Sequence, residues 1–346
     1  MSRGAESAAR AIRCIAAFGL CVTPLGVSAH HSVNAFFDQS RIAEVAGIVT
    51  GVQWRNPHVG IELRVEGPDG AEEWTLISSS INSLERNDLS STSILIGDRV
   101  RAAGWPDRRA ARSLFITNFL LADGREVRMT ATKPQPFRWT SPGDVADTSA
   151  RRATVTDTEG RGLFKVWVRG AAYTQRVPIR FTPSALAAQA AWDPLTDDPV
   201  LDCIAPGMPN AILNPYPIEF VDAGDTITLR LEEWQATRTI HMRNAPDPSL
   251  VAASPLGFSV GRWEGATLVV ETTRVDWPYL DGDGTPQTED VRMTERFTVS
   301  EDGTRLDFEL VVDEPVSLEA PAVWDAYWLW DPSVAIKPYE CVVDPG

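Results

Sequence analysis

Short segments of β-type composition, each ended by a turn signal, recur along most of the 346-residue chain. A chain with many such strands and few helical segments folds as a barrel or a sandwich, so we predict an all-β protein. In the first half the predicted strands are residues 46–54, 58–65, 73–77, 94–105 and 113–121. In the second half they are residues 218–223, 226–232, 237–242, 257–263, 267–273, 291–299, 305–313 and 326–329.

The order of these segments divides the chain into two modules. Three strands, a link that could hold a helix and two further strands predict an OB-like five-stranded barrel within residues 30–130. Residues 131–200 are predicted to be a linker with a short helix after Thr182, although residues 162–168 could be a strand of either neighbour. Residues 201–346 are predicted to form a larger antiparallel, lipocalin-like barrel, with a sandwich as the alternative.

The N-terminus has the features of a cleaved signal peptide. Arginines precede an apolar run at residues 14–27, which is too short to span a membrane. Val27-Ser28-Ala29 supplies the small residues of a signal-peptidase site, so we predict that residues 1–29 are removed. Cys21 suggests a lipoprotein instead, but the leucine before it is large for a lipidation site. The mature protein is therefore expected in the periplasm or secreted, with no membrane span.

Charge excludes one class of partner. The formal net charge is −15, and the predicted signal peptide is itself basic, so the mature chain is more acidic still. An acidic surface repels phosphate backbones, and nucleic acid is therefore a poor partner in spite of the OB-like pattern.

Cysteine usage predicts one disulfide. After cleavage only Cys203 and Cys341 are left, and an oxidising compartment favours their pairing. They lie near the two ends of the second module, which the bond would close. Two separate buried thiols are the alternative. Neither cysteine belongs to a CxxC pair, which argues against redox or zinc-ribbon chemistry.

The placement of the four histidines suggests a metal site. Cleavage after Ala29 would make His30 the N-terminal residue, followed by His31. The α-amine and imidazole of one residue can chelate a metal, and His58 at the turn between the first two strands is the natural third ligand. Nitrogen donors without carboxylates favour Cu(II), so copper is the predicted cofactor.

A plainer interpretation of the same histidines is equally open. His30 and His31 could belong to an unstructured tail, and His58 could cap the turn at Asn56-Pro57. Cleavage one residue later would also remove the chelate.

Candidate catalytic residues in the second module are weaker. The histidine and carboxylates that could line a barrel interior are His241, Glu264, Asp276, Glu295 and Asp313. A buried His–carboxylate pair could transfer protons on a small molecule. A tryptophan cluster near residues 324–330 could line an apolar ligand pocket, although core packing explains such residues more often. The letters G-x-S-x-G around Ser259 lie in a strand pattern without the following helix of a nucleophile elbow.

Two sets of motifs resemble an uncharacterised family of exported bacterial proteins. The first set is His30-His31-Ser32, Phe37-Asp38, Gly47-Ile48-Val49-Thr50, Trp54 and Asn56-Pro57-His58. The second, typical of a C-terminal module, includes Cys203, Pro215-Tyr216-Pro217, Gly261-Arg262-Trp263-Glu264-Gly265 and Tyr339-Glu340-Cys341. The resemblance spans nearly the whole mature chain and implies no activity. Family members usually have an aspartate near Arg243-Asn244-Ala245 that is absent here, so no role of that residue carries over.

These observations predict a binding protein whose partners are a metal ion at the N-terminus and a small hydrophobic ligand in the second barrel. One alternative is a lyase, isomerase or hydratase acting on a small hydrophobic molecule in that barrel. The other is a structural module of the cell envelope.

Overall fold

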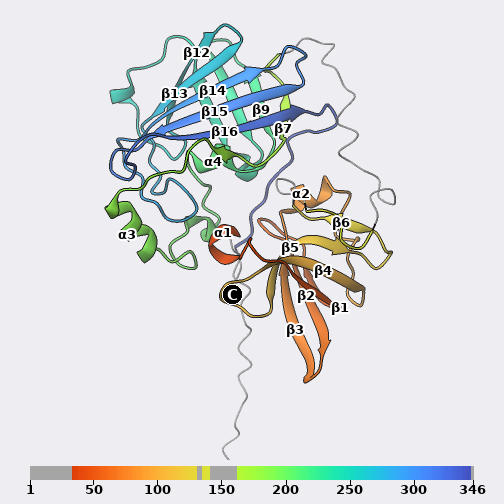
Figure 1. Ribbon diagram of the computed structural model, residues 1–346. Coiled ribbons are helices and arrows are strands. Elements are labelled where there is room, and N and C mark those ends of the chain that lie inside the picture. Colours follow the sequence, from red (N-terminus) through yellow and green to blue (C-terminus); the bar gives the residue numbers. More distant parts are fainter. Residues whose placement is uncertain (1–32, 131–134, 141–161, 344–346) are drawn as a thin grey trace, which may run out of the picture.

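The chain forms two closed β-barrels, a five-stranded one followed by a nine-stranded one. This computed structural model describes residues 33–130, 135–140 and 162–343. Figure 1 shows the second barrel above the first, with the chain after the last strand running down between them. The all-β architecture predicted from the strand pattern is thus confirmed. In the described part of the chain, no helix is long and apolar enough to cross a membrane.

The first barrel has the OB-like order predicted from its segments. Its strands follow the order β3-β2-β1-β4-β5, and parallel pairing of β3 with β5 closes it. The short strand β6 extends the sheet beyond β5. The strands are β1 (Ala43–Gln53), β2 (Gly60–Gly67), β3 (Gly70–Ile77), β4 (Arg99–Pro106), β5 (Ser113–Leu120) and β6 (Glu126–Arg128). The helices are α1 (Val33–Phe36), before β1, and α2 (Ile81–Glu85), between β3 and β4.

Two local irregularities let so small a barrel close. A bulge between Val49 and Gly51 interrupts the pairing of β1 with β2, while the earlier part of β1 pairs with β4. The pairing of β4 with β5 shifts register between Ala103 and Gly104, and a Cβ at Gly104 would stand 2.1 Å from the Phe115 carbonyl oxygen. Any side chain at residue 104 would therefore force these strands apart.

The second barrel closes by pairing β15 with β16. Its strands follow the order β15-β14-β13-β12-β11-β10-β9-β7-β16, with β8 also paired to β16. They are β7 (Val166–Arg169), β8 (Thr174–Gln175), β9 (Ile218–Asp222), β10 (Thr226–Leu231), β11 (Thr237–His241), β12 (Phe258–Glu264), β13 (Thr267–Thr273), β14 (Arg292–Val299), β15 (Arg305–Asp313) and β16 (Ala322–Trp330). The helices are α3 (Pro183–Ala191), α4 (Asn210–Leu213) and the 3-10 turns η3 (Pro199–Asp202), η4 (Glu233–Gln235) and η5 (Pro248–Leu250).

Two features of this barrel differ from a simple antiparallel succession. Strands β7 and β8 come from the segment predicted as a linker, and β7 lies between β9 and β16. Strands β11 and β12 run parallel. The connection between them, residues 242–257, is long enough to bring the chain back to the end of the barrel at which β11 begins. The predicted helix of the linker is present as α3, and the Thr182 side chain caps its N-terminus.

The interior of the second barrel is packed with apolar side chains. Phe297 makes ring contacts with Phe220 and Phe308, whose centroids lie 5.1 and 4.8 Å away. Arg169 at the end of β7 stacks over Trp328 at 4.2 Å and donates to the Ile212, Leu213 and Asn214 carbonyls at the end of α4. A guanidinium there satisfies helix-end carbonyls and holds α4 against the core.

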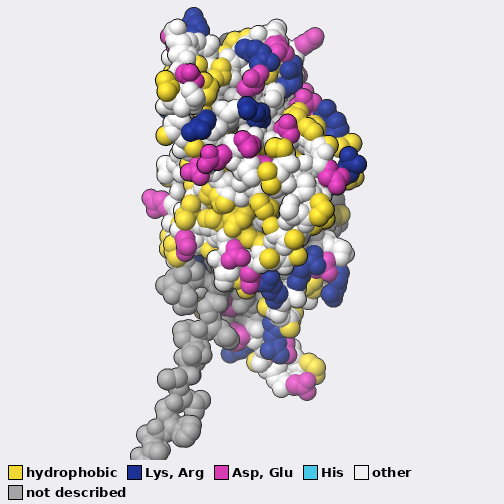
Figure 2. All heavy atoms as spheres, turned by 90° about the vertical axis from the view of Figure 1, so that its left-hand side faces the viewer, with side chains coloured by type: hydrophobic (Ala, Val, Ile, Leu, Met, Phe, Trp, Pro, Cys, Tyr) yellow, Lys and Arg dark blue, Asp and Glu magenta, His cyan; other side chains and the backbone are white. Residues whose placement is uncertain are grey.

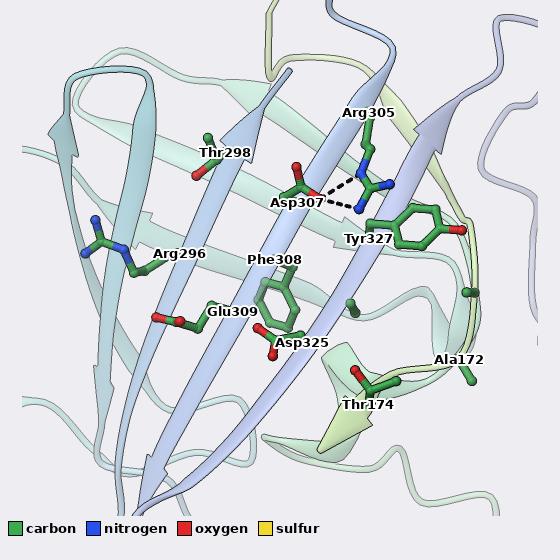
Figure 3. Close-up of a pocket in the computed structure, with 12 residues that line it drawn as sticks. Ala172, Thr174, Arg296, Thr298, Arg305, Asp307, Phe308, Glu309, Asp325 and Tyr327 are labelled. Carbon is green, nitrogen blue, oxygen red and sulfur yellow. Dashed lines mark hydrogen bonds and ion pairs between the residues drawn. The ribbon is translucent and has the colours of Figure 1, made fainter. Parts of the chain in front are cut away.

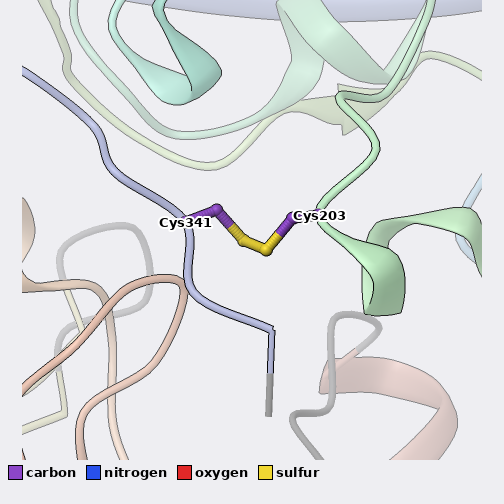
Figure 4. The surroundings of a disulfide bond; sticks show 2 residues. All are labelled: Cys203 and Cys341. Carbon is purple, nitrogen blue, oxygen red and sulfur yellow. A yellow bond between two sulfur atoms is a disulfide. The ribbon is translucent and has the colours of Figure 1, made fainter. Parts of the chain in front are cut away.

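The predicted disulfide is confirmed, but its place was not foreseen. Cys203 and Cys341 are bonded, with their Cα atoms 5.8 Å apart (Figure 4). Cys203 directly follows η3, whereas Cys341 lies on the chain after β16, which has already reached the first barrel. The bond therefore fastens the end of the chain at the contact between the barrels.

Candidate functional site

His58 lies in the loop between β1 and β2 and is held by a backbone hydrogen bond. Its Nδ1 is 2.7 Å from the Ser78 carbonyl oxygen at the end of β3. A carbonyl oxygen can only accept, so in the neutral ring Nδ1 carries the proton and Nε2 carries the lone pair. This is the arrangement of most metal-binding histidines, whose second nitrogen donates to a carbonyl or carboxylate.

The start of the described chain packs beside this histidine. The His58 ring meets Phe115 edge-on, with centroids 6.1 Å apart, and Phe115 belongs to a small cluster with Phe36 and Phe37. Val33 packs against the same cluster. His30 and His31 lie outside the described residues.

The five candidate catalytic residues of the second module do not come together in one interior site. The carboxylates of Glu264, Asp276 and Asp313 are exposed, and Glu264 pairs with Arg262 and Arg296. The half-buried His241 packs on Phe258, with ring centroids 5.0 Å apart. The one fully buried member of the set is Glu295.

Glu295 forms a buried ion pair that sequence analysis did not anticipate. Its carboxylate accepts from both terminal nitrogens of Arg238, and both side chains are almost completely excluded from solvent. Arg238 Nε donates to Ser259 Oγ at 2.8 Å, and its Nη2 also donates to Thr272. Ser259, the serine of the G-x-S-x-G letters, lies inside strand β12 and takes part in this network. These four side chains bond to one another inside the barrel, and we interpret them as a structural network.

A hollow of about 440 Å³ lies on the outer face of the second barrel (Figure 3). Strands β14, β15 and β16 supply most of its charged lining, and these charged groups are all engaged in ion pairs. Arg305 pairs with Asp307 at 2.7 Å and lies over the Tyr327 ring, while Arg296 pairs with Glu264. Because the guanidinium groups are already engaged, a ligand would first have to displace these pairs.

One face of the molecule carries hydrophobic side chains at its surface. Figure 2 shows them gathered at mid-height, between more highly charged regions, on the side where Figure 1 places α3. Leu186 on α3 is about half exposed, and the other exposed positions of this helix are small or apolar. The exposed face of α3 therefore carries no charged side chain that could act in catalysis.

The two barrels meet at a polar contact that we call the junction. It comprises the loop at residues 54–59 and α2 of the first barrel, residues 214–217 and 232–236 of the second, and the chain at 331–343. Its centre is Glu232, which is fully buried. This carboxylate accepts from Arg86, from Asn82 Nδ2 at 3.1 Å and from the Lys337 backbone nitrogen at 3.0 Å. One side chain of the second barrel thus binds both the first barrel and the end of the chain.

Glu233 beside it has a different environment. Burial raises the pKa of Glu233 to about 8, the neighbouring Glu232 charge adds to this, and a hydrogen bond from Asn214 opposes it. Trp234 next in sequence has a φ of 59°, in the left-handed region that a bulky residue adopts only at a cost. The junction therefore holds a carboxyl group whose pKa is raised well above its ordinary value.

This acid predicts a pH-dependent stability. The folded pKa lies above the ordinary value of 4.5, so the stabilisation is fully present below pH 4.5 and is lost as pH rises through about 8. Glu233→Gln keeps a neutral side chain at every pH and should remove this dependence. Between pH 5 and pH 9, we expect the wild-type Tm to fall by at least about 4 °C more than that of the variant. Parallel melting curves of the two proteins across this range would contradict the assignment.

Glu232 and Glu233 of the junction escaped sequence analysis, although one signal was available. The connection from 232 to 236 joins two strands without a glycine, asparagine or aspartate, the residues that ordinarily turn a hairpin. A turn of this kind has to be held by tertiary contacts, and Glu232 supplies them. In the described part of the chain, no group of three or more histidine, cysteine or acidic side chains is placed to hold a metal ion.

Comparison with known proteins identifies one related region. Residues 19–114 match the model of a family of unknown function (DUF6152). The matched region contains the N-terminal motifs through Asn56-Pro57-His58 and most of the first barrel. A search of curated proteins found no match to the chain.

Proposed function

We propose that this protein binds one Cu(II) ion at the first barrel, through the amine and imidazole of an N-terminal His30 and through His58, with His31 adjacent. The observation that supports this most is the hydrogen bond from His58 Nδ1 to the Ser78 carbonyl oxygen. This hydrogen bond favours the tautomer in which Nδ1 carries the proton and Nε2 carries the lone pair. The imidazole of His58 can therefore bind a metal ion through Nε2 without changing its tautomer.

The position of His58 supports the same proposal. Its ring and Val33 both pack at the Phe115 cluster, which brings the start of the described chain to the histidine. Export supplies the free N-terminus that the chelate needs, and the Cys203–Cys341 disulfide fits an oxidising compartment such as the periplasm. Imidazole and amine donors place Cu(II) ahead of the other divalent ions of the first transition row.

Two sequence-based alternatives are less well supported. The enzyme hypothesis needs a reactive set of side chains and a small hydrophobic molecule inside the second barrel. That interior is packed with apolar side chains, and Glu295 is paired with Arg238. A structural envelope module would make no use of the His58 arrangement. We therefore put copper binding forward as the function.

Copper titration of protein beginning at His30 tests the proposal. We expect one equivalent of Cu(II), with an electron paramagnetic resonance spectrum showing nitrogen ligation. Addition of three residues before His30 should weaken binding most, because it separates the α-amine from the imidazole of His30 and leaves no histidine among the first three residues. His58→Ala should weaken binding by at least roughly tenfold, which is the lower end of the loss caused by removing even a supporting hydrogen bond.

His241→Ala is the matched control, since His241 is also half-buried but lies in the second barrel. It should bind copper as the wild type does. Equal affinity of wild type, extended protein and His58→Ala would refute the proposed site. N-terminal sequencing of the exported protein should find His30 first, and a mature chain that keeps Met1 or carries lipid on Cys21 would refute it as well.

A further inference from the structure

The chain after β16 forms a strap between the two barrels, which we define as residues 331–343. In Figure 1 it runs from the second barrel to the first. Its Lys337 backbone nitrogen donates to Glu232 of the second barrel, and its Pro338 carbonyl accepts from Asn82 of the first at 3.1 Å. Tyr339 is buried against Tyr216 and Trp234, with ring centroids 5.5 and 5.4 Å away. The middle of the strap is thus held by many contacts.

The end of the strap is held differently. Cys341 lies alongside Asn56 as a parallel bridge, and the Val342 nitrogen donates to the Asn56 carbonyl at 3.1 Å. Asn56 is buried, but residues 340–343 on the strap side are half-buried or exposed, in contrast to Tyr339. One isolated bridge, made by strap residues that are themselves half-buried or exposed, is a weak attachment, so the disulfide to Cys203 is the principal fastening of this end.

The fastening lies close to His58. Asn56 is two residues before it, and the Asn56 side chain accepts from the Ile81 nitrogen at 2.9 Å, which ties the loop to α2. Pairing with Cys341 adds support from the other side of the same residue. Both cysteines are half-buried, which leaves the bond accessible to a small thiol.

We propose that the Cys203–Cys341 bond is a redox-operated clamp that sets the order of the His58 loop. A dithiol reductant breaks the S–S bond by thiol–disulfide exchange. The two cysteines gain two electrons and two protons as thiols, and the dithiol becomes a disulfide. Residues 340–343 then leave Asn56, while Tyr339 and Glu232 keep the rest of the strap and both barrels in place.

Hydrogen exchange of the metal-free protein, with and without dithiol, tests this inference. Without metal, the outcome does not depend on copper binding. We expect the backbone amides of residues 54–59 other than Pro57, and that of Val342, to exchange at least about tenfold faster after reduction, because the local opening exposes them to solvent. Amides of β13 in the barrel core should be unchanged. Reoxidation should restore slow exchange at residues 54–59.

The double variant Cys203→Ser/Cys341→Ser provides the matched control. It should show the fast exchange of reduced wild type and give no response to dithiol. Exchange at residues 54–59 that changes less than twofold on reduction would overturn the inference, as would equal acceleration throughout the second barrel. Should the variant fail to fold, reversible reduction of the wild type decides between these outcomes.

Discussion

Glu295→Ala should lower the free energy of unfolding of the second barrel by about 3–5 kcal/mol, because it leaves the Arg238 guanidinium buried without its counter-charge. The pair is almost fully excluded from solvent, and Arg238 is held on β11 by backbone pairing with β10. Its guanidinium cannot reach water without disturbing the barrel. Urea denaturation followed by tryptophan fluorescence measures the loss.

Two variants make this prediction specific. Glu264→Ala removes an exposed carboxylate that also pairs with arginine, and it should cost less than about 1 kcal/mol. Replacement of both buried partners, Arg238→Met with Glu295→Leu, should recover most of the loss, since apolar pairs of similar volume often replace buried ion pairs without penalty. If Glu295→Ala lowers the free energy of unfolding by less than about 1 kcal/mol, water reaches the Arg238–Glu295 pair and the prediction is wrong.

Glu232→Ala should have the second large effect, on the coupling of the two barrels. This buried carboxylate accepts from Arg86, Asn82 and the Lys337 nitrogen, so its removal leaves three donors at the junction without their acceptor. We expect a loss of about 3–5 kcal/mol. Differential scanning calorimetry should show one cooperative transition in the wild type and two separate transitions in the variant.

Glu85→Ala is the matched control for the junction. Glu85 bonds Lys337 at 2.7 Å across the same contact, but both side chains are about 40% exposed. Its removal should cost less than about 1 kcal/mol and leave a single transition. Two transitions in the wild type itself would mean that the barrels unfold independently and that Glu232 does not couple them.

The strand pattern predicted most of the fold because its signals are local. Alternation along β2 and β15, and turn residues such as those at 68–70 and 302–303, act within a few positions of the chain. The disulfide was predictable for a different reason, since the predicted removal of residues 1–29 would leave only two cysteines to pair. His58 was a candidate ligand from its neighbours in sequence, but the hydrogen bond that orients its ring involves Ser78 on another strand.

Sequence by itself therefore determined most of the strands, the division into two β modules and the pair of cysteines that is bonded. Only the tertiary structure decided the roles of Glu232 and Glu233, two identical neighbours. Glu232 meets Arg86 and Asn82 from the other barrel, whereas Glu233 lies in a desolvated site that raises its pKa. The environment of a carboxyl group depends on its burial and, for Glu232, on a partner some 150 positions away in the chain. No pattern within a few residues of Glu232 encodes those partners.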